Sequence, residues 1–158
     1  MNVAIDATPL RLTRAGTARY LESLLSRLDL QPISFGGPGR ASVLARELWW
    51  YPVRLSLLRD VDLLHCPTYY GPLRPRVPTV VTVHDLAALR RPEWFPAWTR
   101  TYAPRIAPRV IRAAWAYFAP CIRRVRGCTH CGWCSGTRSC TIVDRSPPRC
   151  GGYIQSLK

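Results

Sequence analysis

Lysine is nearly missing from this chain of 158 residues, although the chain is strongly basic. Lysine and arginine together number 23, and Lys158 is the single lysine among them. Acidic residues number 9, so the formal net charge is +14. A surface designed to bind phosphates has reason to use both basic residue types. The skew toward arginine therefore indicates arginine-rich codon usage rather than a dedicated phosphate-binding surface.

Long hydrophobic runs and a secretory signal are also missing. The longest apolar uncharged run covers residues 113–122, about half of the roughly 20 residues that a membrane-spanning helix needs. The N-terminus carries no basic region, and Asp6 lies where the apolar stretch of a secretory signal would run. We therefore expect a cytoplasmic protein.

The chain divides into two parts of different composition. Its length is that of one ordinary domain, and its hydrophobic content of 47% excludes a wholly disordered chain. Residues 1–121 contain segments of strand and helix type. In residues 122–158 the apolar residues recur neither with the period of a helix nor with that of a strand. We predict a folded domain over residues 1–121 and a Cys/Arg/Gly-rich tail over residues 122–158.

The tail has three interpretations. A GC-rich gene read out of frame yields Arg, Gly, Cys, Pro, Ser and Trp without periodicity, and these residues make up most of the tail. An irregular or disordered tail of native sequence is the second interpretation. The third is a zinc site, because thiolates two residues apart can share one ion with a fourth ligand. Its candidate ligands are Cys128, Cys131, Cys134 and Cys140.

In the first part, short apolar segments typical of strands alternate with amphipathic segments typical of helices. The predicted strands cover residues 3–5, 33–35, 61–65, 79–83 and 115–119. This alternation predicts an α/β fold, a Rossmann-like parallel sheet with flanking helices joined by right-handed crossovers.

The predicted helices run from Gly16 to about residue 28, over residues 41–51 and over residues 96–112. The second helix carries Leu44, Leu48 and Tyr51 on one side. Pro52 is predicted to interrupt it and to begin a new helical turn that runs through Leu58. Two further prolines, Pro104 and Pro108, lie inside the third helix and predict a kink or a break there.

Polar residues follow the predicted strands at the edge where parallel sheets bind their ligands. Asp6 ends the first strand, His65 ends a later one, and His84 with Asp85 follows the β-branched strand. Gly16 opens the first helix, where free backbone N–H groups and the helix dipole favour an anion. These residues are therefore predicted to converge on one edge of the sheet.

Structural roles for the same residues stay open. Asp6 also fits a cap of the following turn, and His65 fits a turn residue. Gly16 stands without a complete G-x-G-x-x-G motif. His84 is harder to explain structurally, because it follows an apolar strand and adjoins an acid.

Several blocks in residues 2–121 resemble the N-terminal half of the retaining glycosyltransferases of family 4. The order and the spacing of the blocks fit this family, and the Val-His-Asp-Leu string in company with the others is fairly specific. The blocks are residues 3–10, 16–20, 61–67, 78–87 and 91–95.

The resemblance implies a GT-B enzyme with two Rossmann-like domains and an active site in the cleft between them. The first domain would mainly hold the acceptor, and the second would hold most of the nucleotide-sugar. Ala18 stands where many relatives carry a second glycine. The second domain and its Glu-containing donor motif are missing from this chain, so the resemblance covers one half of a GT-B fold.

The resemblance also implies roles for single residues. Gly16 and Thr17 would approach the donor diphosphate through backbone N–H groups. His84 would lie beside the transferred sugar and act in catalysis, with Asp85 supporting the His or its loop. The acceptor side would include Asp6 and His65.

Two functions of different classes follow. The first is hexose transfer from a nucleotide-sugar to a glycan or lipid-linked acceptor with retention, needing no cofactor and inactive in this fragment alone. Such a protein would be cytoplasmic, with peripheral contact to anionic lipid at the inner face of the membrane. The alternative is a basic zinc-binding module that contacts nucleic acid through its Cys/Arg-rich tail.

Overall fold

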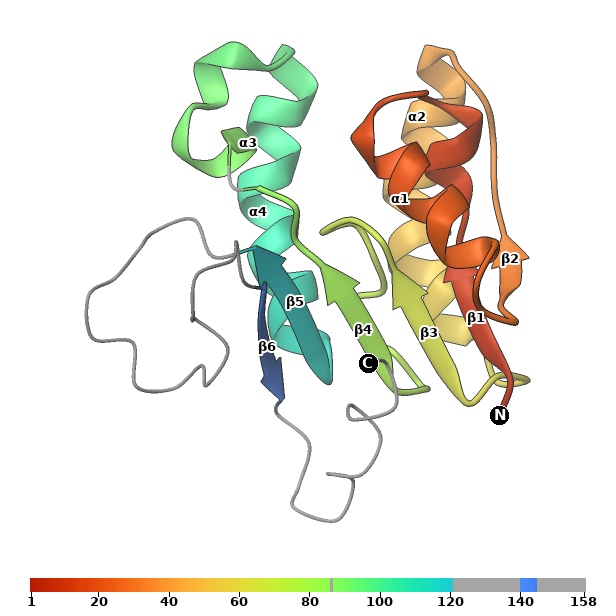
Figure 1. Ribbon diagram of the computed structural model, residues 1–158. Coiled ribbons are helices and arrows are strands. Elements are labelled where there is room, and N and C mark those ends of the chain that lie inside the picture. Colours follow the sequence, from red (N-terminus) through yellow and green to blue (C-terminus); the bar gives the residue numbers. More distant parts are fainter. Residues whose placement is uncertain (86, 121–139, 145–158) are drawn as a thin grey trace.

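The structure is a computed structural model that describes residues 1–85, 87–120 and 140–144, the side chains of 116–120 and 140–144 excepted (Figure 1). Over these residues the strands form one sheet in the order β2-β1-β3-β4-β5-β6. The strands are β1 (Val3–Asp6), β2 (Gln31–Ile33), β3 (Leu63–Cys66), β4 (Thr79–Thr82), β5 (Ala116–Pro120) and β6 (Cys140–Asp144).

The predicted parallel α/β sheet with flanking helices is confirmed. The strands β2, β1, β3, β4 and β5 pair in parallel in that spatial order. The predicted irregular tail contains one strand. This strand, β6, pairs antiparallel with β5, and Tyr117 lies opposite Val143. The remainder of the predicted tail lies outside the described residues.

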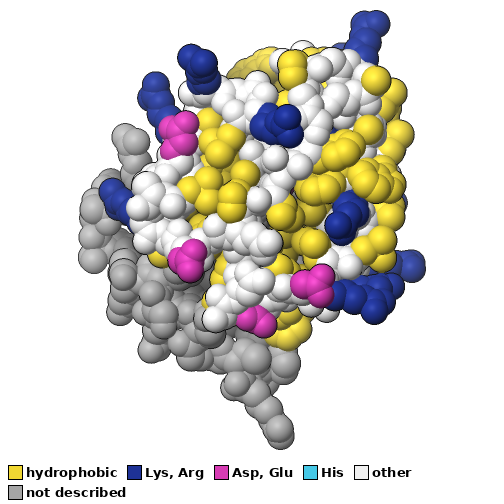
Figure 2. All heavy atoms as spheres, turned by 90° about the vertical axis from the view of Figure 1, so that its right-hand side faces the viewer, with side chains coloured by type: hydrophobic (Ala, Val, Ile, Leu, Met, Phe, Trp, Pro, Cys, Tyr) yellow, Lys and Arg dark blue, Asp and Glu magenta, His cyan; other side chains and the backbone are white. Residues whose placement is uncertain are grey.

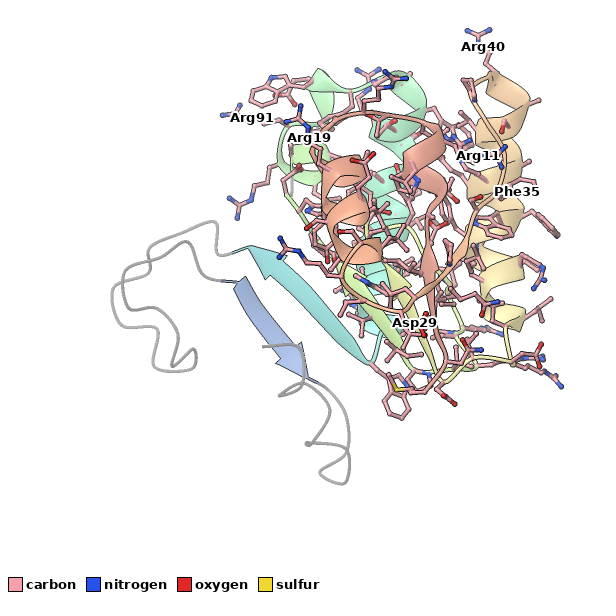
Figure 3. The ribbon with its side chains drawn as sticks, turned by 45° about the vertical axis from the view of Figure 1, so that its right-hand side comes forward. Arg11, Arg19, Asp29, Phe35, Arg40 and Arg91 are labelled. Carbon is pink, nitrogen blue, oxygen red and sulfur yellow. The ribbon has the colours of Figure 1, made fainter. Side chains whose placement is uncertain are left out.

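The helical segments lie between the strands. They are η1 (Thr8–Arg11), α1 (Gly16–Leu25), α2 (Arg40–Ala45), η2 (Arg46–Arg54), η3 (Leu55–Leu57), α3 (Ala87–Arg90), η4 (Pro92–Trp94) and α4 (Ala97–Ala113). The segment α1 covers one face of the sheet, and η2, η3 and α4 cover the other (Figures 1 and 3). Among these segments, α1 begins at Gly16 as predicted.

The predicted break in α4 is wrong, because the helix is continuous through Pro104 and Pro108. A proline deprives the carbonyl four residues earlier of its donor. Those carbonyls belong to Arg100 and Pro104, both exposed, so water can replace the lost donors. The opposite side of the helix buries Ala103 and other residues against the sheet, and this packing outweighs the proline cost of about 3 kcal/mol each.

The predicted interruption at Pro52 is also wrong. The helical backbone continues from α2 into η2, a segment of π-helix that contains Pro52. Its wider turns bring different residues inward than an α-helical period predicts. Leu44 and Leu48 are exposed, whereas Arg46 and Glu47 are buried beside Tyr51. Of the three residues predicted to lie on the inner side, Leu44, Leu48 and Tyr51, only Tyr51 is buried.

The main hydrophobic core lies between the sheet and the helices η2, η3 and α4. From the strands and the residue just after β4 it contains Ala4, Leu64, Cys66, Val81 and Val83. From the helical segments and the C-cap of α4 it contains Tyr51, Leu55, Val110 and Ala114. Across the sheet, α1 buries Ala18 and Leu21. Among the described residues no helix is long and apolar enough to cross a membrane.

We expect Leu64→Ala to lower the free energy of unfolding by about 2–5 kcal/mol, because it opens a cavity in this core. The matched control is Leu28→Ala, since the Leu28 side chain is 39% exposed; it should change stability by less than about 0.5 kcal/mol. Urea denaturation of both variants measures the difference. Equal effects of the two substitutions would contradict the described core.

Candidate functional site

Strand alternation divides the polar residues of the carboxyl edge between the two faces of the sheet. Ile5 pairs with His65 in the register of β1 and β3. Partners in a sheet share a face and neighbours along a strand do not, so Asp6 lies on the other face, beside Cys66. The structure therefore does not bring Asp6 together with His65, although both had been predicted on the acceptor side.

His65 and His84 do come together, on the face that α1 covers. Nε2 of His65 lies 2.9 Å from Oγ1 of Thr82. The Tyr20 ring meets both imidazoles edge-on, with ring centroids 6.2 Å from His65 and 5.2 Å from His84. The Tyr20 hydroxyl lies 3.4 Å from the same Thr82 oxygen. We call Tyr20, His65, Thr82 and His84 the histidine cluster.

The two histidines differ in their hydrogen bonding. Burial, and to a lesser extent the neighbouring His84, lowers the pKa of His65 to about 4. His65 is therefore neutral at pH 7. Its Nε2 and the Thr82 hydroxyl form one hydrogen bond, in which the tautomer of His65 decides the donor. Nε2 of His84 is buried and has no hydrogen-bond partner among the described residues. A buried polar atom without a partner costs about 1–3 kcal/mol, and a catalytic role is one of the explanations for such an atom.

The first turn of α1 lies one helical turn from the histidine cluster. Tyr20 is four residues after Gly16 and so lies on the same side of the helix. The N-cap residue Ala15 provides no side-chain cap, and the first turn carries no acid. Gly16 is exposed, and a Cβ atom there would meet nothing within 4 Å. The uncapped N–H groups of this turn can therefore receive an anion.

Asp6 serves the turn that follows β1. Its Oδ1 accepts hydrogen bonds from the backbone N–H of Thr8 at 3.2 Å and from the Thr8 hydroxyl at 2.5 Å. Burial raises the pKa of Asp6 to about 6, against the lowering effects of Thr8, Trp50 and Arg46. Its Oδ2 is buried and has no hydrogen-bond partner among the described residues. The geometry supports the capping role that the sequence had left open.

Asp85 also caps a helix. Its Oδ1 accepts a hydrogen bond from the N–H of Ala87 at 2.8 Å, and Ala87 is the first residue of α3. Asp85 is exposed. It therefore fixes the loop that carries His84, and no contact between its side chain and the imidazole is described.

A cavity of about 180 Å³ opens between the segments that follow β1 and β3. The strand order changes direction between these two strands, which is where α/β sheets commonly bind ligands. Thr17 of α1 lines this cavity, so α1 reaches both the cavity and the histidine cluster. The other lining residues include Arg46, Glu47, Tyr51, Thr68 and Tyr70. We call it the switch-point cavity.

Arg46 and Glu47 bring opposite charges into this cavity. Nη1 of Arg46 donates to the carbonyl of Gly37 at 2.9 Å and to Oγ of Ser42 at 3.3 Å. Oε2 of Glu47 accepts a hydrogen bond from the indole N–H of Trp98. Burial raises the pKa of Glu47, and the Trp98 hydrogen bond and Arg46 oppose this. Arg46, Glu47 and two tyrosines therefore place hydrogen-bonding side chains around a cavity whose lining surface is otherwise largely apolar.

Sequence reasoning missed Arg46, Glu47 and Tyr70. The signal was Glu47, which lies four residues before Tyr51 and so on the same side of a helical segment. Arg46 lies five residues before Tyr51 and comes onto that side through the wider turns of η2. Burying two charged side chains and a tyrosine hydroxyl costs free energy unless hydrogen bonds or a ligand pair with them. The expectation that leucines fill the inner side concealed this signal.

The zinc interpretation has no support in the described part of the chain. Residues 1–85 and 87–120 contain no group of three or more His, Cys, Asp or Glu side chains placed to hold a metal ion. Cys128, Cys131 and Cys134 lie outside the described residues, and Cys140 is described only through the backbone of β6. The zinc interpretation of the tail stays a hypothesis.

Comparison of the chain with protein-family models, with curated proteins and with solved structures found no match. The resemblance to family 4 glycosyltransferases therefore stays a prediction from the sequence blocks.

Asp6 and His65 give the stability of the fold opposite pH dependences. The pKa of Asp6 is raised from 3.8 to about 6, so its contribution is complete below pH 3.8 and is lost as the pH rises through 6. The pKa of His65 is lowered from 6.5 to about 4, so its contribution is complete above pH 6.5 and is lost as the pH falls through 4. Each effect is on the order of 3 kcal/mol and they oppose each other.

We expect Asp6→Asn to leave the His65 effect unopposed. The free energy of unfolding of this variant should therefore rise more steeply between pH 4 and pH 6.5 than that of the parent chain. His65→Asn should give the converse, a fall over the same interval. Urea denaturation at stepped pH measures both slopes, with Asp29→Asn as an exposed control. Parallel slopes in all four proteins would show that neither buried group has a shifted pKa.

Proposed function

We propose that this chain is the acceptor-side half of a retaining glycosyltransferase of the GT-B type. The observation that carries the proposal is the buried, unpartnered Nε2 of His84, two residues beyond β4 and in ring contact with Tyr20 of α1. A catalytic imidazole needs a free nitrogen at the ligand edge of the sheet. The sequence blocks that resemble family 4 support the same assignment.

The chemistry of sugar transfer requires stabilisation of the leaving diphosphate. Negative charge develops on that group in the transition state, and donors aimed at it lower the barrier. In the proposed enzyme the uncapped N–H groups at Gly16 and Thr17 provide such donors, and the helix dipole of α1 adds to them. His84 would donate from Nε2 to a hydroxyl or ring oxygen of the transferred hexose.

The acceptor would enter the switch-point cavity. A hydroxyl-rich ring offers both donors and acceptors, and the residues that line the cavity include Arg46, Glu47 and Tyr70. Since Thr17 lines the same cavity, an acceptor held there would lie near the donor position at the start of α1. Asp6 and His65 would act as supports of the loop and of Thr82 rather than as acceptor ligands.

The second domain would bind most of the nucleotide-sugar, so the present chain provides half of the cleft. Without the other half the donor loses most of its contacts and water is not excluded. We therefore expect turnover near background for this chain with sugar nucleotides and glycan or lipid-linked acceptors.

The decisive experiment joins residues 1–121 to the sequence encoded downstream of codon 121, expressed in each reading frame. One frame should give a protein that transfers a hexose from a sugar nucleotide, with retention of the anomeric configuration shown by NMR of the product. In that protein His84→Asn should lower kcat by about 100-fold or more, as loss of a transition-state hydrogen bond does.

The control is Arg27→Gln, an exposed residue outside the site and outside the blocks that carry the resemblance, which should keep the parent kcat. Clear turnover by the present chain alone would contradict the proposal. Full activity of His84→Asn in the joined protein would also contradict it.

A further inference from the structure

The helical segment 40–57, which comprises α2, η2 and η3, has an outer face of unusual composition. Every residue of this segment whose side chain is exposed is either apolar or arginine. These residues are Arg40, Ala41, Leu44, Leu48, Trp49, Val53, Arg54 and Leu57. An exposed acid or neutral polar side chain does not occur among residues 40–57.

The apolar residues of this outer face are large and accessible. Their exposed fractions are 44% for Leu44, 57% for Leu48, 46% for Trp49, 43% for Val53 and 46% for Leu57. Hydrophobic side chains gather over α2 and η2, with arginine among them (Figure 2). Contiguous exposed apolar surface of this kind marks a binding surface.

The inward charges of the same segment explain why its apolar residues face outward. Arg46 and Glu47 are buried and line the switch-point cavity. Because these residues point inward, Leu44, Leu48 and Trp49 point outward. The outer face is therefore linked to the cavity through one helical segment.

We propose that the outer face of residues 40–57 binds the surface of an anionic lipid bilayer. Helices that lie in a membrane interface combine Leu and Trp with arginine, and they insert an apolar face without crossing the bilayer. Trp is favoured at the boundary between hydrocarbon and headgroups. Arg40 and Arg54 lie at or near the two ends of the segment, and Arg40 extends away from the end of α2 (Figure 3).

A groove continues the apolar face at its N-terminal end. It has a volume of about 460 Å³ and lies between α2 and α4, lined by Gly39, Arg40, Val43, Leu44 and Trp98. The Trp98 indole N–H is bonded to Glu47, so the groove and the switch-point cavity share this contact. A lipid at this position would meet apolar walls with an arginine at the rim.

Charge complementarity favours a lipid surface over a second copy of this chain. In a two-fold contact each copy presents the same patch to the other. The exposed charges of residues 40–57 are arginines alone, so such a contact would bring like charges together without an acid from this segment to pair them. Phosphate headgroups provide the missing negative charge.

This inference rests in part on the proposed function, since a membrane-bound chain would meet a lipid-linked acceptor at its switch-point cavity. Vesicle binding is measured without any sugar transfer. Failure of transfer and failure of membrane docking are therefore separate results.

The test is co-sedimentation of the full chain with vesicles of phosphatidylcholine, with and without phosphatidylglycerol. We expect binding to the mixed vesicles, and Leu48→Gln with Trp49→Gln should weaken it at least about tenfold, because two apolar side chains no longer enter the bilayer. The matched control is Leu28→Gln with Trp115→Gln, whose parent side chains are 39% and 41% exposed elsewhere on the molecule. The control should bind within about twofold of the parent chain.

The arginines are tested in the same assay, because a formal net charge of +14 alone would attract anionic vesicles. Arg40→Gln with Arg54→Gln should weaken binding by about fivefold for each charge removed near the surface. Arg19→Gln with Arg27→Gln removes two exposed charges, one in α1 and one just after it, and should have a much smaller effect.

Three results would overturn the proposal. One is unchanged vesicle binding by the Leu48 and Trp49 variant, and another is equal weakening by the two arginine pairs. The third is a dimer, seen by light scattering, that does not bind vesicles and becomes monomeric in the Leu48 and Trp49 variant. Because all substituted residues are exposed, circular dichroism should show an unchanged fold in each variant.

Discussion

The parallel pairing of β1, β3 and β4 determines which polar side chains at the carboxyl edge can act together. Parallel strands end at one edge, and alternation then assigns each residue to one of two faces. His65, Thr82 and His84 share the face under α1, whereas Asp6 lies beside Cys66 on the face under η2. The helix α1 joins the two sides, since Tyr20 contacts the histidines and Thr17 lines the switch-point cavity.

The second constraint is the orientation of Arg46 and Glu47. Their burial gives the switch-point cavity a cation and a carboxylate, and it also directs Leu44, Leu48 and Trp49 outward. One helical segment therefore provides both two charged residues beside a cavity and an apolar outer surface. A chain that holds a polar ligand on one side of this segment and lipid on the other would suit an acceptor that has both a sugar and a lipid part.

The sequence was sufficient for the strand and helix alternation, for the start of α1 at Gly16 and for the position of His84 beyond β4. It failed where tertiary packing overrides local preference, as in α4, which continues through Pro104 and Pro108. It also failed at η2, because the π-helical turns changed which side faces inward. The separation of Asp6 from His65 follows from the register of β1 and β3, which spacing along the chain does not reveal. The failures at η2 and at Asp6 concern residues near the candidate site, where conflict between local preference and packing is expected.

The central claim is that the first turn of α1 and the loop after β4 face one ligand. An NMR titration of the isotope-labelled chain with nucleoside diphosphate and with nucleotide-sugar tests it most directly. The account predicts that the amides of Gly16 and Thr17 shift together with the imidazole of His84, with one common dissociation constant. Shifts confined to scattered arginines, or shifts at α1 that leave His84 unchanged at saturation, would contradict it.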